Sequence, residues 1–145
     1  MPIAIETRPA ENLIVLVHTG LVPDDEFLAF YRRLYESDDF DPAMNQLVDL
    51  READSGPRSP EALRQFASFV RTRLNDLPSR PKVAVVAPKA LSFGLARMYE
   101  AHADAVPWDF TVFRSLDAAL AWLGVPEDLR LEHEHGAEPS VPGDA

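Results

Sequence analysis

The side chains of a hydrolytic triad occur in this chain as His18, Asp49 and a serine at a strand end, either Ser92 or Ser115. A triad depends on geometry, because the base must reach the serine and the acid must orient the base. The chain has no Gly-x-Ser-x-Gly segment, the turn that exposes a nucleophilic serine. His18 also stands within an apolar strand, which is typical of a hydrogen-bonded structural histidine. We therefore predict no catalytic residues, no hydrolase activity on generic esters or phosphates, and a protein that is not an enzyme.

Metal chemistry has one candidate segment, Glu132-His133-Glu134-His135. Adjacent residues of a polar tail do not impose the rigid geometry of a metal site, so the segment supports only adventitious binding. The chain has no cysteine, which excludes disulfides and thiolate ligands and fits a reducing cytoplasm. We predict no metal and no cofactor.

Basic side chains follow the predicted parallel strands of this otherwise acidic protein. They are Arg51, Lys89, Arg97 and Arg114. Together with the start of a helix at Ser92, they could bind a small anion. The alternative is that each pairs with a nearby carboxylate, which is a common and weak surface interaction. The absence of a glycine-rich phosphate loop favours this alternative.

Apolar runs and amphipathic segments alternate along the chain. The predicted strands are Ile3–Thr7, Asn12–Thr19, Met44–Leu50, Lys82–Ala87 and Asp109–Arg114. Helices are predicted to start after Pro23, after Ser59, at Ser92-Phe93-Gly94 and after Ser115. The first two strands are close enough for a hairpin, and the later ones are separated by helical crossovers. This order predicts a single α/β domain with a mixed sheet of about five strands, the first pair antiparallel and the rest mainly parallel, and about four helices.

Local signals set the expected boundaries of these elements. Gly20 is expected to break the second strand, and Arg51–Arg58 is expected to be a polar loop. Ser59 and Ser115 are N-cap residues, and Gly124 ends the last helix.

The length and the net charge of the chain limit the classes of partner and function. The chain has 145 residues, with 24 acidic and 14 basic residues and a net charge of −10. This charge disfavours nucleic acid or an anionic membrane as a partner. The apolar runs are too short to span a membrane, and no signal peptide is visible. We expect a cytoplasmic protein whose α/β domain covers residues 1–125 and whose residues 126–145 form an acidic, flexible tail.

Four blocks of the sequence resemble a known group of small bacterial proteins. They are IVLVHTGLVPDDEFLAFYRRL, QLVDLRE, KVAVVAPKALSFGLARMYE and FTVFRSLDAALAWLG. The chain resembles the SpoIIAA-like proteins, which are grouped with the STAS domain and with Sec14-type lipid-binding domains. The similarity covers about Asn12 to Gly124, and its motifs are mainly structural, so it implies the fold more directly than an activity.

The resemblance also implies a phosphorylation site. In anti-sigma-factor antagonists, a serine in an Asp-Ser-Ser-Gly turn at a helix start is phosphorylated by a partner kinase. Here Leu47–Leu50 matches the strand before that turn, and Asp54-Ser55-Gly56 resembles the turn, with a single serine, a shorter spacing and Pro57 after it. The resemblance thus implies that Ser55 or Ser59 carries a phosphate. The alternative is an Asx turn followed by an ordinary N-cap.

Three classes of function are considered, and we predict the first of them. The first is a non-enzymatic regulatory or protein-interaction domain, the second is a carrier or sensor of a small anionic or lipid-like ligand, and the third is an enzyme. For the first two, we expect the recognition surface at one rim of the sheet, formed by Ser55, Ser59, Lys89, Ser92 and Arg97.

Aromatic residues are numerous on the predicted helices. They are Phe27, Phe30, Tyr31, Tyr35, Phe66, Phe69 and Tyr99. Some are expected to exceed what one sheet face can cover, and exposed aromatics favour interfaces. We therefore predict a homodimer through a helical face.

Overall fold

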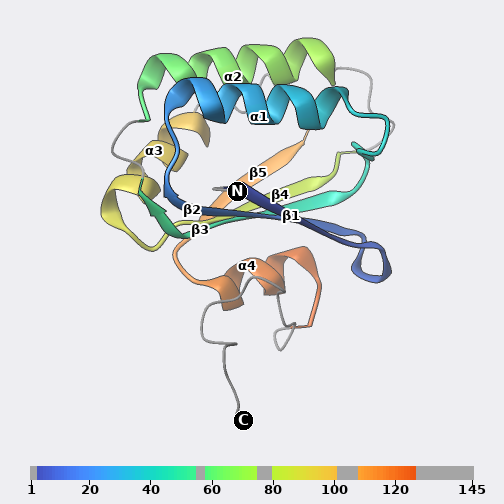
Figure 1. Cartoon of the computed structure of the whole chain (residues 1–145). Coiled ribbons are helices and arrows are strands. Elements are labelled where there is room, and N and C mark those ends of the chain that lie inside the picture. Colours follow the sequence, from blue (N-terminus) through green and yellow to red (C-terminus); the bar gives the residue numbers. More distant parts are fainter. Residues whose placement is uncertain (1–2, 55–57, 75–79, 101–107, 127–145) are drawn as a thin grey trace.

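A five-stranded mixed sheet forms the centre of the fold, with helices on both faces (Figure 1). The structure, a computed structural model, describes residues 3–54, 58–74, 80–100 and 108–126. The strands are β1 (Ile3–Arg8), β2 (Leu13–Leu21), β3 (Asn45–Asp54), β4 (Lys82–Val86) and β5 (Asp109–Phe113), in this order across the sheet. The helices are α1 (Asp24–Glu36), α2 (Pro60–Arg73), α3 (Ala90–Glu100) and α4 (Leu116–Leu123).

Strand directions confirm the predicted topology. β1 and β2 are antiparallel, and a 3₁₀ turn over Pro9–Glu11 joins them, ending at Asn12 in the left-handed region with φ 55°. The pairs β2–β3, β3–β4 and β4–β5 are all parallel. Each parallel pair requires a crossover, and the helices α1, α2 and α3 supply these connections.

Alternation along the strands separates two cores. In β2, Ile14 and Leu16 face the layer of α1, α2 and α3, whereas Leu13, Val15 and Val17 face α4. The inner strand β4 is buried on both faces because helices cover both sides of it. Figure 1 shows α1 and α2 above the sheet and α4 below it.

The ends of β2 and β3 correct two predictions. Gly20 does not break β2, and Arg51–Asp54 are not a loop but the last part of β3. A bulge between Val17 and Thr19 shifts the register, after which the two strands stay paired to Leu21 and Asp54. Backbone pairing thus overrides the polar sequence of this segment. Gly20 has φ 69°, which a glycine adopts without strain.

The capping predictions are confirmed. The side chains of Ser59 and Ser115 accept hydrogen bonds from the backbone N–H groups of Ala62 and Ala118 at the starts of α2 and α4. Gly124 ends α4 with φ 77°. Three acids occupy the first turn of α1, at the positive end of its dipole.

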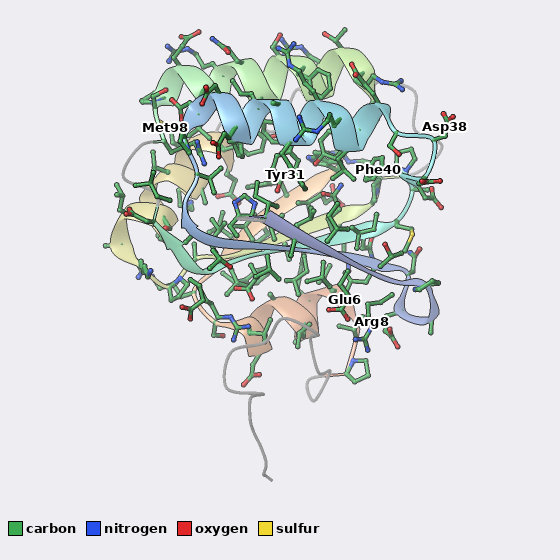
Figure 2. The ribbon with its side chains drawn as sticks, in the orientation of Figure 1. Glu6, Arg8, Tyr31, Asp38, Phe40 and Met98 are labelled. Atoms are coloured by element: carbon green, nitrogen blue, oxygen red, sulfur yellow. The ribbon has the colours of Figure 1, made fainter. Side chains whose placement is uncertain are left out.

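The aromatic residues of the helices are covered within the chain, contrary to the expectation of excess exposed rings. Six of the seven are buried, and Phe69 is partly buried against the same core. Figure 2 shows Tyr31 pointing from α1 toward the sheet. The reason given for a helix-mediated homodimer is therefore wrong, and the homodimer itself stays a prediction.

The sequence also predicts that no segment spans a membrane and that the last residues form a tail. Within the described ranges, no helix has the length and apolar character that crossing a membrane requires. The predicted tail, residues 126–145, lies outside the described residues except for Pro126.

Candidate functional site

A cavity lies between the sheet and the layer formed by α1, α2 and α3. The volume of this cavity is about 100 Å³. Its most exposed lining residues, Gly20 and Asp54, stand at the carboxyl ends of β2 and β3, beside Arg58. We call these three residues the mouth. The cavity therefore opens at the edge of the sheet where α/β folds place their binding sites.

The walls of the cavity are mainly apolar and aromatic. Val48 and Leu50 of β3 and Val85 of β4 form its floor, and Phe27, Leu63 and Phe66 line it from the helices. Val48 and Leu50 remain partly exposed although helices cover their strand, because they border this space. An apolar space with few polar groups is the usual form of a small-molecule site.

The far end of the cavity is polar and lies near the amino ends of the parallel strands. We call Tyr35, Gln46, Tyr99 and Trp108 the inner polar cluster. The Tyr35 hydroxyl donates to Gln46 Oε1 at 3.2 Å. Gln46 pairs in register with Val83, which pairs with Phe110, and the ring of Tyr99 lies 4.8 Å from that of Phe110. These contacts bring β3, β4, β5 and α3 together at one point.

Three polar atoms of this cluster have no hydrogen-bond partner in the described part of the chain. They are Gln46 Nε2, the Tyr99 hydroxyl and Trp108 Nε1. The three residues are only 1%, 3% and 2% exposed, yet all line the cavity. A buried polar group without a partner costs about 1–3 kcal/mol, and natural proteins have few of them. Three such atoms at one end of one cavity indicate that a group outside the described residues satisfies them.

His18 and Tyr31 form a closed polar pair in the cavity wall. Nε2 of His18 lies 2.8 Å from the Tyr31 hydroxyl, and both residues are buried. Burial, reinforced by the nearby charge of Arg58, lowers the pKa of His18 to about 3. Burial also raises the pKa values of Tyr31, Tyr35 and Tyr99. At neutral pH all four side chains are therefore uncharged hydrogen-bonding groups.

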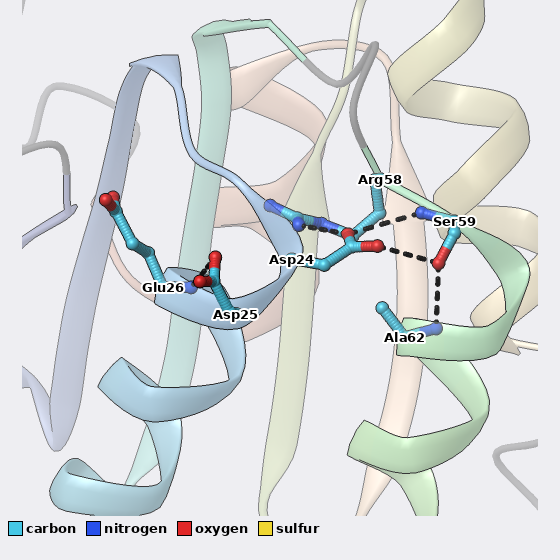
Figure 3. Close-up of polar contacts among 6 residues, drawn as sticks. All are labelled: Asp24, Asp25, Glu26, Arg58, Ser59 and Ala62. Atoms are coloured by element: carbon cyan, nitrogen blue, oxygen red, sulfur yellow. Dashed lines mark hydrogen bonds and ion pairs between the residues drawn. The ribbon is translucent and has the colours of Figure 1, made fainter.

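Arg58 connects the mouth of the cavity to the first turn of α1 (Figure 3). Its guanidinium lies 4.0 Å from the centre of the Phe27 ring and forms an ion pair with Asp24 at 2.8 Å. The Ser59 hydroxyl donates to the same carboxylate at 2.7 Å. Partial burial raises the pKa of Asp24, but the bonds from Ser59 and Arg58 outweigh it, and the net pKa is lowered. The N-termini of α1 and α2 are thereby joined above the cavity.

The predicted rim residues do not share one role. Ser55 lies outside the described residues. Ser59 caps α2 and bonds to Asp24, where a phosphate would meet a like charge. Lys89 follows β4 and donates to the backbone carbonyl of Ala53 in the last part of β3 at 3.0 Å, so the carboxyl ends of these two strands lie side by side. Ser92 is buried and lines the cavity, whereas Arg97 is exposed and pairs with Glu100 at 2.8 Å.

The other basic candidates are also engaged. Arg51 pairs with Asp49 at 2.8 Å, and Arg114 lies over the Phe93 ring at 4.0 Å. Two of the four, Arg51 and Arg97, thus pair with carboxylates, as the alternative to an anion site described. Lys89 and Arg114 instead reach backbone carbonyl groups.

The sheet separates Asp49 of the hypothetical triad from His18 and Ser92, which both line the cavity. His18 lines the cavity on the face of α1 and α2. Asp49 lies two residues beyond Leu47, which packs against α4, so its side chain points to the opposite face. Ser115 is the N-cap of α4. Among the described residues, no group of three His, Cys, Asp or Glu side chains is placed to hold a metal ion. The Glu132–His135 segment lies outside those residues.

Comparison with known proteins supports the fold. A solved structure of an uncharacterized protein from the DUF3478 family with a SpoIIAA-like fold, from Shewanella loihica PV-4, is similar to this chain with a TM-score of 0.51. The similarity covers 83% of this chain and 91% of that protein at 17% sequence identity. No protein-family model and no curated protein matches the chain. The chain therefore has the SpoIIAA-like fold that its sequence predicts, and this level of identity carries the fold alone.

Sequence reasoning missed the inner polar cluster. Gln46 gave a signal, because an amide within an apolar strand must find partners if it is buried. Tyr99 was recognised only as part of the apolar stripe of a helix. Trp108 precedes β5 and gave no pattern at all. Only the register of the strands brings these residues together.

Proposed function

We propose that this protein is a non-enzymatic carrier or sensor that binds a small, largely apolar molecule in the cavity between the sheet and α1–α3. The observation that carries this proposal is the set of three unpartnered, buried polar atoms at the inner end of an apolar cavity. A ligand with a polar end would satisfy atoms that the described residues leave unpaired.

Binding is favoured over catalysis by the protonation states of the cavity. General acids and bases work best when their pKa lies near the operating pH. The pKa of His18 is lowered to about 3, and those of the tyrosines are raised. These groups can give and accept hydrogen bonds at neutral pH, but they are poorly matched to proton transfer.

The size of the cavity limits the ligand. A closed cavity of about 150 Å³ holds one benzene molecule. The space here, about 100 Å³, suits a molecule of at most one ring, or the end of a longer molecule whose remainder passes the mouth. A complete lipid would not be enclosed, which narrows the lipid-like alternative to small molecules or chain ends.

Cavity filling tests the proposal. Ala96 lines the cavity on α3, so Ala96→Phe should occupy the space that the ligand needs. Ala121→Phe is the matched control, because Ala121 is exposed on α4 at the opposite face. The measurement is two-dimensional NMR of each protein during titration with benzene or toluene.

We expect shifts of Val48, Leu50 and Leu63 in the parent and in Ala121→Phe, but not in Ala96→Phe. Val48→Phe serves as a second filling variant if Ala96→Phe fails to fold. A folded parent whose cavity residues do not respond to either probe would contradict the proposal, and so would an unchanged response in both filling variants.

A further inference from the structure

The polarity of the inner cluster specifies which end of a ligand it can accept. Gln46 Nε2 and Trp108 Nε1 are donors only, and the Tyr99 hydroxyl can donate. Gln46 Oε1, the acceptor of the amide, is already bonded to Tyr35. The groups of the cluster that lack a partner are therefore mostly donors. A complementary ligand must supply a hydrogen-bond acceptor.

Two of these donors lie close together. Trp108 is near enough to the Tyr99 hydroxyl to favour its ionised form, although burial dominates and raises the pKa of Tyr99. If the indole N–H approaches the Tyr99 oxygen, the Tyr99 proton still has no acceptor in the described part of the chain. Either arrangement leaves donors without a partner among the described residues, on side chains that line the cavity.

The charges around the cavity exclude an anion from this end. Of the described lining residues, only Asp54 and Arg58 carry a charge at neutral pH, and both lie at the mouth. Arg58 is already balanced by Asp24. A carboxylate placed at the inner cluster would lose its hydration without meeting a cation, which costs several kcal/mol. A neutral carbonyl oxygen accepts the same hydrogen bonds at a much smaller desolvation cost.

We propose that the ligand is a neutral carbonyl compound, of the ketone, aldehyde, ester or amide type, whose oxygen accepts hydrogen bonds from Gln46 and from Tyr99 or Trp108. Its apolar part lies along Val48, Leu50 and Phe66 toward the mouth. This inference rests on the proposed function, since it names the chemical class of ligand for the same cavity.

Three probes of nearly equal shape test this proposal. Acetophenone has a ring and a neutral carbonyl, ethylbenzene replaces the carbonyl by a methylene group, and benzoate replaces the methyl group by a charged oxygen. Dissociation constants are measured by NMR titration of the full chain at one pH near neutrality and one salt concentration. One net hydrogen bond is worth about 0.5–1.5 kcal/mol, so two should favour acetophenone over ethylbenzene by about 5- to 150-fold.

Variants of the cluster supply a second readout. Gln46→Leu, Tyr99→Phe and Trp108→Phe should each weaken acetophenone binding several-fold and leave the ethylbenzene dissociation constant nearly unchanged. Ethylbenzene is thus the internal control for damage to the cavity, and three separate variants guard against one that does not fold.

The outcomes separate this inference from the proposed function. Equal binding of acetophenone and ethylbenzene, or tightest binding of benzoate, would overturn the carbonyl assignment and leave a ligand-binding cavity. No binding of any probe to the folded parent would overturn both. A preference for acetophenone that disappears in the cluster variants would support both.

Discussion

The Ser59 hydroxyl lies 2.7 Å from Asp24 Oδ2 and accepts the N–H of Ala62 at the same time, so one serine caps α2 and ties it to the first residue of α1. Ser115 caps α4 in the same way, accepting the N–H of Ala118 at 3.2 Å, but it bonds to no carboxylate in the described part of the chain. The two serines therefore form a matched pair for measuring the link between α1 and α2.

Replacing Ser59 by alanine should destabilise the protein more than replacing Ser115. Loss of an N-cap costs about 1 kcal/mol in either case. Ser59→Ala also removes a charge-assisted bond to a partly exposed carboxylate, which we expect to add up to about 1 kcal/mol after solvent screening. Urea unfolding at pH 7 measures both variants. Equal losses of unfolding free energy would show that the Ser59–Asp24 bond contributes nothing to stability.

Removing the hydroxyl of Tyr31 and removing that of Tyr99 should have different effects on the stability of the protein. Tyr31→Phe leaves Nε2 of buried His18 without its partner, and we expect it to cost about 1–3 kcal/mol. Tyr99→Phe removes a hydroxyl that has no partner in the described residues, so the ligand-free protein should be equally stable or slightly more stable.

Chemical unfolding of both variants, after removal of any co-purified small molecule, is the measurement. A loss for Tyr99→Phe as large as that for Tyr31→Phe would mean that the Tyr99 hydroxyl is satisfied within the chain. That result would remove one of the three atoms on which the proposed function rests.

His18 predicts a loss of stability on mild acidification. Its pKa is about 3 in the folded protein and near 6.5 when unfolded, so between these values the unfolded chain binds the extra proton. The contribution is fully present above pH 6.5 and is lost as the pH falls toward 3, at up to about 1.4 kcal/mol per pH unit. The lowered pKa of Asp24 adds a loss of the same sign at lower pH.

The control for this prediction is His18→Phe, which cannot titrate at that position. Urea unfolding of the parent and of the variant at several pH values from 7.5 to 5 gives the two slopes. We expect the variant to be less stable at pH 7.5 but to have a flatter dependence on pH. Identical slopes would mean that His18 is accessible to protons in the folded protein.

The sequence predicted the architecture because the fold depends on patterns that are local. The apolar run of Val83–Val86, the proline-containing start of α2 and the caps at Ser59 and Ser115 each act over a few residues. The strand end at Arg51–Asp54 was predicted wrongly because its pairing with β2 follows a bulge that no local pattern shows.

The candidate site could not be predicted in the same way. The recognition rim was expected from hydroxyl and basic side chains near strand ends, but Ser59, Lys89 and Arg97 all bond to groups of the chain itself. Of the four rim residues that the structure describes, Ser92 is the one that lines the cavity. The inner polar cluster combines residues from β3, α3 and the start of β5, and its unpaired atoms are apparent only when packing shows which partners are missing.

The hydrogen bond between Tyr35 and Gln46 leads to a prediction about how variants of this pair change stability and ligand binding. Gln46→Leu removes an unpaired buried donor, but it also deprives the Tyr35 hydroxyl of the acceptor that lies 3.2 Å away. The double variant Tyr35→Phe with Gln46→Leu removes both partners and leaves an apolar surface of similar shape. Replacing both members of a buried polar pair is often neutral or stabilising, whereas removing one is not.

We therefore expect the double variant to be about 1 kcal/mol more stable than Gln46→Leu and at least as stable as the parent without ligand. Its acetophenone binding should still be weakened, because Gln46 Nε2 is gone. Unfolding free energies of the parent, both single variants and the double variant form a double-mutant cycle that isolates the coupling between the two residues. A double variant less stable than Gln46→Leu would contradict this prediction, because the Tyr35 hydroxyl would then contribute to stability through a group other than Gln46.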